Sequence, residues 1–85
     1  MDTAPITIYG THTCSDCQRT KLFLEQQNIP YTILYIEDDE KALEKSLEIN
    51  GNQTITPTVV FPDGSWMVEP DNEQLLEKLK EQKLV

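Results

Sequence analysis

Long apolar segments are missing from this sequence of 85 residues. No stretch approaches the roughly 20 consecutive apolar residues that a membrane-spanning helix needs. The first five residues, Met-Asp-Thr-Ala-Pro, have neither the basic start nor the apolar stretch of a secretion signal. We therefore expect a cytoplasmic protein that does not act in a membrane. A chain of this length fits one domain over residues 1–85.

Basic residues are also scarce, since 7 lysines and arginines face 15 acidic residues and the net charge is −8. Nucleic acids and anionic membrane surfaces need a basic footprint, so we expect neither as a partner. Within the first 40 residues the only cations are Arg19 and Lys21. They either bind an anionic thiol or a substrate carboxylate, or are ordinary exposed cations of a helix.

Cysteine occurs only at Cys14 and Cys17, in the segment Thr-His-Thr-Cys-Ser-Asp-Cys of residues 11–17. A disulfide stabilises a fold chiefly by closing a long loop, so a pair this close is no structural staple. A zinc site needs four ligands, and a second pair of cysteines or histidines is absent. His12 is the only histidine and adds a third ligand at best, so a metal or iron–sulfur centre would have to be shared between two chains.

The remaining sequence predicts alternating strands and helices. Short β-rich runs predict strands at residues 6–9, 31–36, 58–61 and 66–68. Helix formers and cap signals predict helices at residues 15–27, about 40–50 and from about 72 onward. The strand at 31–36 is apolar on both faces, so we expect it to be buried. Residues 62–65, Pro-Asp-Gly-Ser, predict a hairpin turn between the last two strands.

The predicted order is therefore β-α-β-α-β-β-α. A right-handed crossover makes the first two strands parallel, and the closing hairpin adds two antiparallel strands. This arrangement is an α/β fold with a mixed four-stranded sheet flanked by helices.

The cysteine pair lies where the first predicted strand ends and the first helix begins. Unpaired backbone N–H groups and the helix dipole favour an anion there, so we expect a reactive thiolate at Cys14. Cys17 follows one turn later on the same face, close enough to form a disulfide with Cys14. The spacing suits thiol–disulfide exchange in which Cys14 attacks and Cys17 resolves.

Two neighbours are candidates for tuning the acidity of the Cys14 thiol. The carboxylate of Asp16 opposes a second anion at the helix start and would make the pair a stronger reductant. Alternatively, Asp16 simply supports the start of the helix. His12 either holds a proton near Cys14 or is an ordinary loop histidine.

A second candidate site is Thr56-Pro57, just before the third predicted strand. A cis bond there would be a specific feature, because cis peptide bonds are essentially confined to proline. It would leave the backbone N–H and C=O groups of Thr56 free to pair with an extended substrate chain. The alternative is a plain turn.

Together these segments resemble the glutaredoxin branch of the thioredoxin fold, and among its members the mycoredoxins and small glutaredoxin-like proteins. The likeness covers roughly residues 5–82 and is carried by residues 9–10, 14–21, 52–58 and 63–65. It implies a thioredoxin-like fold with Cys14 as nucleophile and Cys17 as resolving cysteine. It also implies that Pro57 is the family's cis-proline and that Thr56 binds substrate through its backbone. Members of this family reduce protein disulfides or mixed disulfides with small thiols.

Two departures from the family pattern bear on the small thiol. Ser15-Asp16 replaces the Pro-Tyr that is common between the cysteines. The Gly-Gly, small residue and Asp that hold glutathione near the last helix are replaced by Met-Val-Glu-Pro-Asp at residues 67–71. Asp71 is retained as a candidate for substrate binding, but Glu69 adds negative charge. Mycothiol and bacillithiol are therefore alternatives to glutathione.

The sequence thus predicts a monomeric disulfide reductase of the glutaredoxin or mycoredoxin type that requires no bound cofactor. Its expected partners are disulfide-containing proteins and either a small thiol or a reductase as the electron source. Two alternatives stay open. One is a thioredoxin-like electron donor fed by a flavoprotein thioredoxin reductase. The other is a metal- or iron–sulfur-binding module with Cys14 as a ligand.

Overall fold

The computed structural model describes residues 5–51 and 55–84. Residues 52–54, the first part of the resembling stretch at 52–58, lie outside the described residues. The elements follow the predicted order: β1 (Ile6–Gly10), α1 (Ser15–Gln26), β2 (Tyr31–Tyr35), α2 (Glu40–Asn50), β3 (Thr58–Val60), β4 (Trp66–Val68) and α3 (Asn72–Glu81). None of the helices in the described ranges has the length and apolar character needed to cross a membrane.

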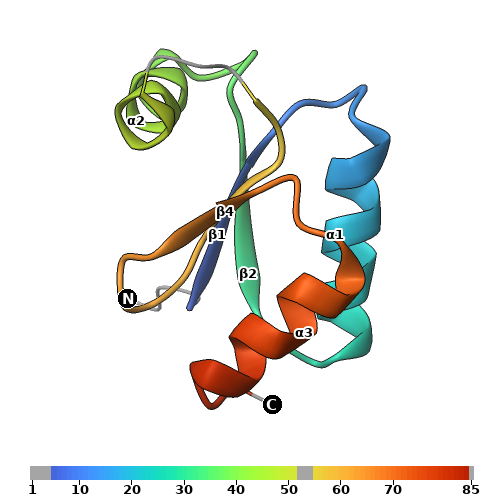
Figure 1. The fold of residues 1–85 in the computed structure, drawn as a ribbon. Coiled ribbons are helices and arrows are strands. Elements are labelled where there is room, and N and C mark those ends of the chain that lie inside the picture. Colours follow the sequence, from blue (N-terminus) through green and yellow to red (C-terminus); the bar gives the residue numbers. More distant parts are fainter. Residues whose placement is uncertain (1–4, 52–54, 85) are drawn as a thin grey trace.

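The four strands form one mixed sheet in the order β2-β1-β3-β4, which confirms the predicted architecture. β1 runs parallel to β2, with Ile6 opposite Tyr31 and Gly10 opposite Tyr35. β3 is antiparallel to β1, and β4 is antiparallel to β3. Helices α1 and α3 lie on one face of the sheet and α2 lies on the other (Figure 1). Because β1 and β2 are parallel, their C-terminal ends lie at the same end of the sheet. The cysteine pair follows the C-terminal end of β1.

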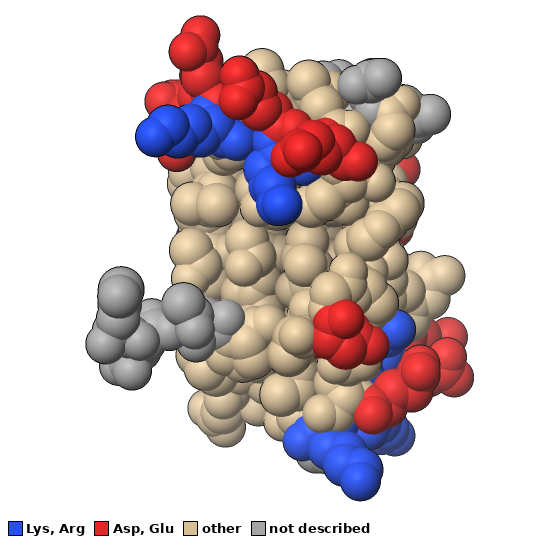
Figure 2. All heavy atoms as spheres, turned by 90° about the vertical axis from the view of Figure 1, so that its left-hand side faces the viewer, with Lys and Arg blue, Asp and Glu red and all other residues tan. Residues whose placement is uncertain are grey.

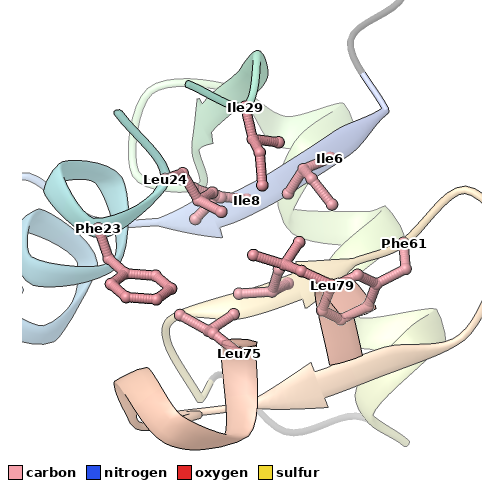
Figure 3. Close-up of a cluster of buried hydrophobic side chains, with 9 residues drawn as sticks. Ile6, Ile8, Phe23, Leu24, Ile29, Phe61, Leu75 and Leu79 are labelled. Atoms are coloured by element: carbon pink, nitrogen blue, oxygen red, sulfur yellow. The ribbon is translucent and has the colours of Figure 1, made fainter. Parts of the chain in front are cut away.

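The hydrophobic core lies between the sheet and the helices α1 and α3. Side chains from both helices converge on those of the strands (Figure 3). The buried cluster consists of Ile6, Ile8, Phe23, Leu24, Ile29, Val59, Phe61, Leu75 and Leu79. Burying one large aliphatic or aromatic side chain contributes roughly 1.5–3 kcal/mol. This layer therefore fixes α1, and with it the cysteine pair, against the central strand β1.

The opposite face of the sheet is only partly covered by α2. Figure 2 shows this side of the molecule, where charged side chains gather at two ends and a broad band between them carries few. Trp66 of β4 is 46% exposed, and the next residue, Met67, packs against the core. Adjacent side chains of a strand point to opposite faces of the sheet. Trp66 therefore faces away from the core.

The prediction that the second strand is buried was wrong. Among the strands of the described residues, β2 pairs only with β1 and lies at the edge of the sheet. Its residues are half-buried, and Thr32 is exposed. An apolar run of this kind also suits an edge strand, because burial depends on the order of strands and on how far the helices reach.

The predicted turns and helix ends are confirmed. Gly51 ends α2 with φ of 65°, in the left-handed region that favours glycine. Asp71 and Gln74 form the predicted capping box at the start of α3. In the hairpin the Phe61 N–H donates to the Ser65 carbonyl at 2.8 Å. These local signals set where α2 ends, where the chain reverses between β3 and β4, and where α3 begins.

Candidate active site

The two cysteines lie at the start of α1. Cys14 is the N-cap residue, and its Sγ accepts the backbone N–H of Cys17 at 3.1 Å. Both are free thiols, but Cys14 is half-buried whereas Cys17 has no exposed surface. Helix N–H groups and the helix dipole favour negative charge at an N-cap. The arrangement thus presents one accessible sulfur and holds a second one beneath it.

Burial governs the chemistry of Cys17. The pKa of Cys17 is raised to about 12, first because burial penalises the thiolate and second because its thiol hydrogen-bonds to Cys14. Hydrogen bonds from the Thr11 backbone and the Thr56 hydroxyl lower this pKa without offsetting the increase. At neutral pH Cys17 is therefore an uncharged thiol.

Gly10, the last residue of β1, provides the space that Cys17 occupies. A Cβ atom at position 10 would lie 2.8 Å from Cys17 Sγ and 3.3 Å from Cys17 Cβ. Both distances are shorter than the roughly 3.5–4.0 Å of favourable contacts. The sequence analysis recognised Gly10 only as the end of a strand. A glycine within a predicted strand often marks a place where another group approaches the backbone closely. This signal was available in the sequence at Gly10.

The Thr56-Pro57 peptide bond is cis, as the resemblance implies. Pro57 is fully buried, and its carbonyl accepts the backbone N–H of Glu69 at 2.8 Å. The hydroxyl of Thr58 accepts a hydrogen bond from Asn50 Nδ2 at 2.7 Å, which links the end of α2 to the start of β3. These contacts hold the Thr56-Pro57 segment from both sides.

Thr56 lies near the cysteine pair, since its side chain is among the groups that lower the pKa of Cys17. Within residues 5–51 and 55–84, neither the N–H nor the C=O of Thr56 takes part in a hydrogen bond. The tertiary structure therefore brings together three residues that the sequence analysis selected at separate positions: Cys14, Cys17 and Thr56.

Arg19 connects α1 to the start of α3. Its Nη1 donates to Asn72 Oδ1 at 2.6 Å, and its Nη2 donates to the Pro70 carbonyl at 2.7 Å. Its Nε lies 3.6 Å from Asp16 Oδ1. Lys21, by contrast, forms no ion pair with the described residues. Roles in substrate binding for Arg19 and Lys21, and in tuning the thiol for Asp16, stay predictions.

Asp71 is exposed, and its carboxylate is engaged in the cap of α3. Its Oδ1 accepts the N–H of Gln74 at 2.8 Å, and its own N–H donates to Gln74 Oε1 at 3.0 Å. Glu69, also exposed, has a φ of 49°. The start of α3 thus adds two carboxylates close to the helix that carries the cysteines. Binding of substrate by Asp71 stays a prediction.

The ring of His12 is held by the segment that follows β2, not by the cysteines. Its Nε2 donates to Asp38 Oδ2 at 2.7 Å. Its ring stacks on Tyr35, with centroids 3.7 Å apart and an angle of 15° between the planes. Among the described residues, the hydrogen bond to Cys14 Sγ comes from the Cys17 N–H and none comes from the His12 ring. The structure therefore does not place a proton of His12 on Cys14.

Tyr35 and Asp38 did not emerge from the sequence as part of this site. Their contact with His12 depends on the parallel pairing of β1 and β2, which places Gly10 opposite Tyr35. The segments that follow two adjacent parallel strands lie at the same end of the sheet. The predicted parallel pairing could therefore have indicated that residues 11–13 lie near the segment after β2. No group of three or more His, Cys, Asp and Glu side chains within the described ranges is arranged to hold a metal ion.

Comparison with known proteins places this geometry in a family. The profile of the glutaredoxin family matches residues 6–66. A glutaredoxin of Mycobacterium tuberculosis is 38% identical over 79 residues, which cover 93% of this chain and 94% of that protein. Mycoredoxin 1 of Corynebacterium glutamicum is 29% identical over 75 residues, covering 88% of this chain and 92% of that protein.

A solved structure agrees with the assignment. The crystal structure of a glutaredoxin from Archaeoglobus fulgidus superposes with a TM-score of 0.75 at 29% identity, covering 87% of this chain and 84% of that one. The thioredoxin-like fold is thereby confirmed. The Cys14–Cys17 pair at the start of α1 is the thiol pair of a thiol oxidoreductase. This chain belongs to the glutaredoxin family.

Proposed function

We propose that this chain reduces disulfides with Cys14 as the attacking thiolate and Cys17 as the resolving thiol. The observation that carries the proposal is the contrast between the two sulfurs. Cys14 is accessible at the N-cap, while Cys17 is buried one turn below and its N–H points to Cys14 Sγ at 3.1 Å. An accessible nucleophile beside a protected second thiol suits a reaction in two consecutive exchanges.

In the first exchange the Cys14 thiolate attacks one sulfur of the substrate disulfide. The substrate S–S bond breaks, the leaving thiolate takes up a proton, and Cys14 is left in a mixed disulfide. Cys17 then gives up its proton and attacks Cys14 Sγ. The Cys14–Cys17 bond forms, the bond from Cys14 to the substrate sulfur breaks, and the released substrate thiolate takes up a proton. Two electrons pass from the pair to the substrate, and a small thiol or a reductase returns them.

The substrates that we propose are protein disulfides and mixed disulfides with a small thiol. Thr56 supports an extended substrate, because its backbone groups have no partner in the described ranges and its side chain is near enough to Cys17 to lower the pKa of that thiol. These groups can pair with a substrate strand beside Pro57. We further propose that the protein acts as a monomer in the cytoplasm and needs no bound cofactor.

Glutathione, mycothiol and bacillithiol are the candidate small thiols. The names glutaredoxin and mycoredoxin of the relatives favour the first two. The exposed carboxylates of Glu69 and Asp71 weigh against an anionic thiol at the start of α3. Arg19 and Lys21 are the cations that would have to compensate, and Arg19 is already bonded to Pro70.

A second candidate function is that of an electron donor fed by a thioredoxin reductase. The acidic start of α3 and the Ser-Asp between the cysteines favour it, because neither feature provides a cationic site for a small anionic thiol. A third candidate function is the binding of a metal or iron–sulfur cluster by Cys14 in a site shared between two chains. The colour and metal content of freshly purified protein distinguish it from the other two candidates.

The test is NADPH-coupled disulfide reduction by the wild type, Cys17→Ser and Cys14→Ser. Electrons are supplied either by a small thiol with its own reductase, one thiol at a time, or by thioredoxin reductase. Turnover by Cys17→Ser with a small thiol, and none by Cys14→Ser, supports the glutaredoxin mechanism. Activity that needs both cysteines and only thioredoxin reductase supports the second candidate. Reduction that survives Cys14→Ser contradicts both.

A further inference from the structure

His12 is held by three separate contacts to one short segment at the end of β2. Its Nε2 donates to Asp38 Oδ2 at 2.7 Å, and its ring stacks on Tyr35 at 3.7 Å between centroids. Its backbone N–H donates to the carboxylate of Glu37. The side chain and the main chain of His12 are thus both fixed to residues 35–38, of which Glu37 and Asp38 are 25 and 26 positions away in the sequence.

The two residues before His12 connect its loop to the cysteine pair. The carbonyl of Thr11 accepts the N–H of Cys14 at 3.4 Å. Gly10 lies against Cys17, since a Cβ atom at position 10 would be 2.8 Å from Cys17 Sγ. The loop that His12 holds therefore continues directly into the backbone that packs against Cys17. The Cys14–Thr11 hydrogen bond is long, so it alone does not fix this loop.

We propose that His12 is a positioning residue for the resolving step, anchoring the loop at residues 11–13 to the end of β2 so that Cys17 can reach Cys14. This proposal rests on the dithiol mechanism above and assigns His12 no contact with the substrate. When the anchor is released, the backbone that follows Gly10 is no longer held in place beside Cys17. Attack by Cys14 on a substrate needs only the helix start, so that step is little affected.

The groups that face the His12 ring show what the anchor needs. Asp38 and Glu37 are carboxylates, Tyr35 stacks on the ring, and Cys14 follows on the same loop. A hydrogen bond that a carboxylate accepts is roughly twice as strong as one between two neutral groups. The anchor therefore needs an N–H donor in the side chain at position 12.

The expected effect is small because the anchor is exposed. The side chains of His12 and Asp38 are 53% and 63% exposed, and such pairs are individually weak. We expect His12→Ala to slow the resolving step about three- to fivefold at pH 6. The same exposure means that the variant folds, which circular dichroism and urea unfolding verify.

The experiment follows the reaction of the reduced protein with 2,2′-dithiodipyridine by stopped flow. Attack by Cys14 releases the first pyridinethione at a rate proportional to reagent concentration. Attack by Cys17 on the mixed disulfide releases the second at a rate independent of it. The proteins compared are wild type, His12→Ala, His12→Gln and Asp38→Asn. Thr13→Ala is the matched control, because it alters an exposed residue of the same loop.

His12→Gln keeps an N–H donor for Asp38 and is therefore the conservative variant that should rescue the anchor. We expect the resolving step of His12→Gln to be faster than that of His12→Ala, with the first phase of both variants unchanged within about twofold.

Equal resolving rates for wild type, His12→Ala and His12→Gln at pH 6 would overturn the proposal and leave the dithiol mechanism intact. Equal resolving rates for His12→Ala and His12→Gln would also overturn it, because the step would then not depend on an N–H donor at position 12. Absence of a second phase in the wild type would instead contradict the dithiol mechanism itself.

Discussion

Replacing Gly10 by alanine tests how closely the central strand packs against the buried thiol. The added Cβ would lie 2.8 Å from Cys17 Sγ, 3.3 Å from Cys17 Cβ and 3.9 Å from Ile33 Cδ1. Favourable contacts lie at about 3.5–4.0 Å, so relief of the shortest one needs a shift of up to about 1 Å. Neither side yields easily, because β1 is an inner strand and Cys17 has no exposed surface.

The expected cost is the difference between two opposing effects. Overpacking a buried site destabilises a protein by about 1–3 kcal/mol. An alanine free of clashes would stabilise it by about 0.4–1 kcal/mol, because it restricts the unfolded chain. We expect Gly10→Ala to lower the free energy of unfolding of the reduced protein by about 1–2 kcal/mol. In a domain of this size the melting temperature falls by roughly 4–15 °C.

Urea unfolding of the reduced protein measures this change, and Cys17→Ala supplies the control background. Removing Sγ makes room for the methyl group, so we expect Gly10→Ala to cost about 1 kcal/mol less in that background. Equal costs in both backgrounds would refute the proposed contact with Cys17. A stabilised Gly10→Ala single variant would refute the close packing altogether.

Three further predictions concern the pH and the helix ends. Because the pKa of Cys17 is raised in the folded state, its stabilising contribution is full below the ordinary thiol value of 9.0 and is lost as the pH rises toward 12. Urea midpoints of the reduced wild type should therefore fall more steeply above pH 9 than those of Cys17→Ala, and parallel curves would contradict the raised pKa. Arg19→Met should lower the free energy of unfolding by about 1–2 kcal/mol, since hydrogen bonds of a charged group to the start of α3 are lost. Lys21→Met, which breaks no described ion pair, is its control in the same urea experiment. Equal effects of the two substitutions would exclude a stabilising role for the Arg19 hydrogen bonds. Asp71→Ala should cost about 1 kcal/mol by removing the capping box, whereas Asp71→Asn should retain most of the stability. A similar loss in both Asp71 variants would show that the cap is not the cause.

The order of elements could be predicted because its signals act over a few residues. Asn50-Gly51 ends a helix, and the polar side chains at 71–74 begin one, whatever the rest of the chain does. The burial of β2 could not be predicted in this way. Its apolar run is compatible with an inner or an edge strand, and only the order β2-β1-β3-β4 decides between them.

The functional residues divide in the same manner. Cys14 and Cys17 were predictable, because a spacing of three at a helix start already brings two sulfurs together. Arg19 was predicted either to bind a substrate anion or to be an ordinary helix cation, and its bonds to Pro70 and Asn72, 51 and 53 positions away, were not foreseen. No periodicity in the sequence records such a contact, since it arises only when α1 and α3 pack on the same face.

The sequence by itself determined the thiol pair, its place at the start of a helix, and the α/β architecture, because each depends on neighbours within one turn or one strand. Only the tertiary structure decided what surrounds the pair. Gly10 lies against Cys17, Thr56 is brought to the same sulfur, and His12 is drawn to Asp38. These contacts join segments that meet through strand pairing and core packing, which no local pattern specifies.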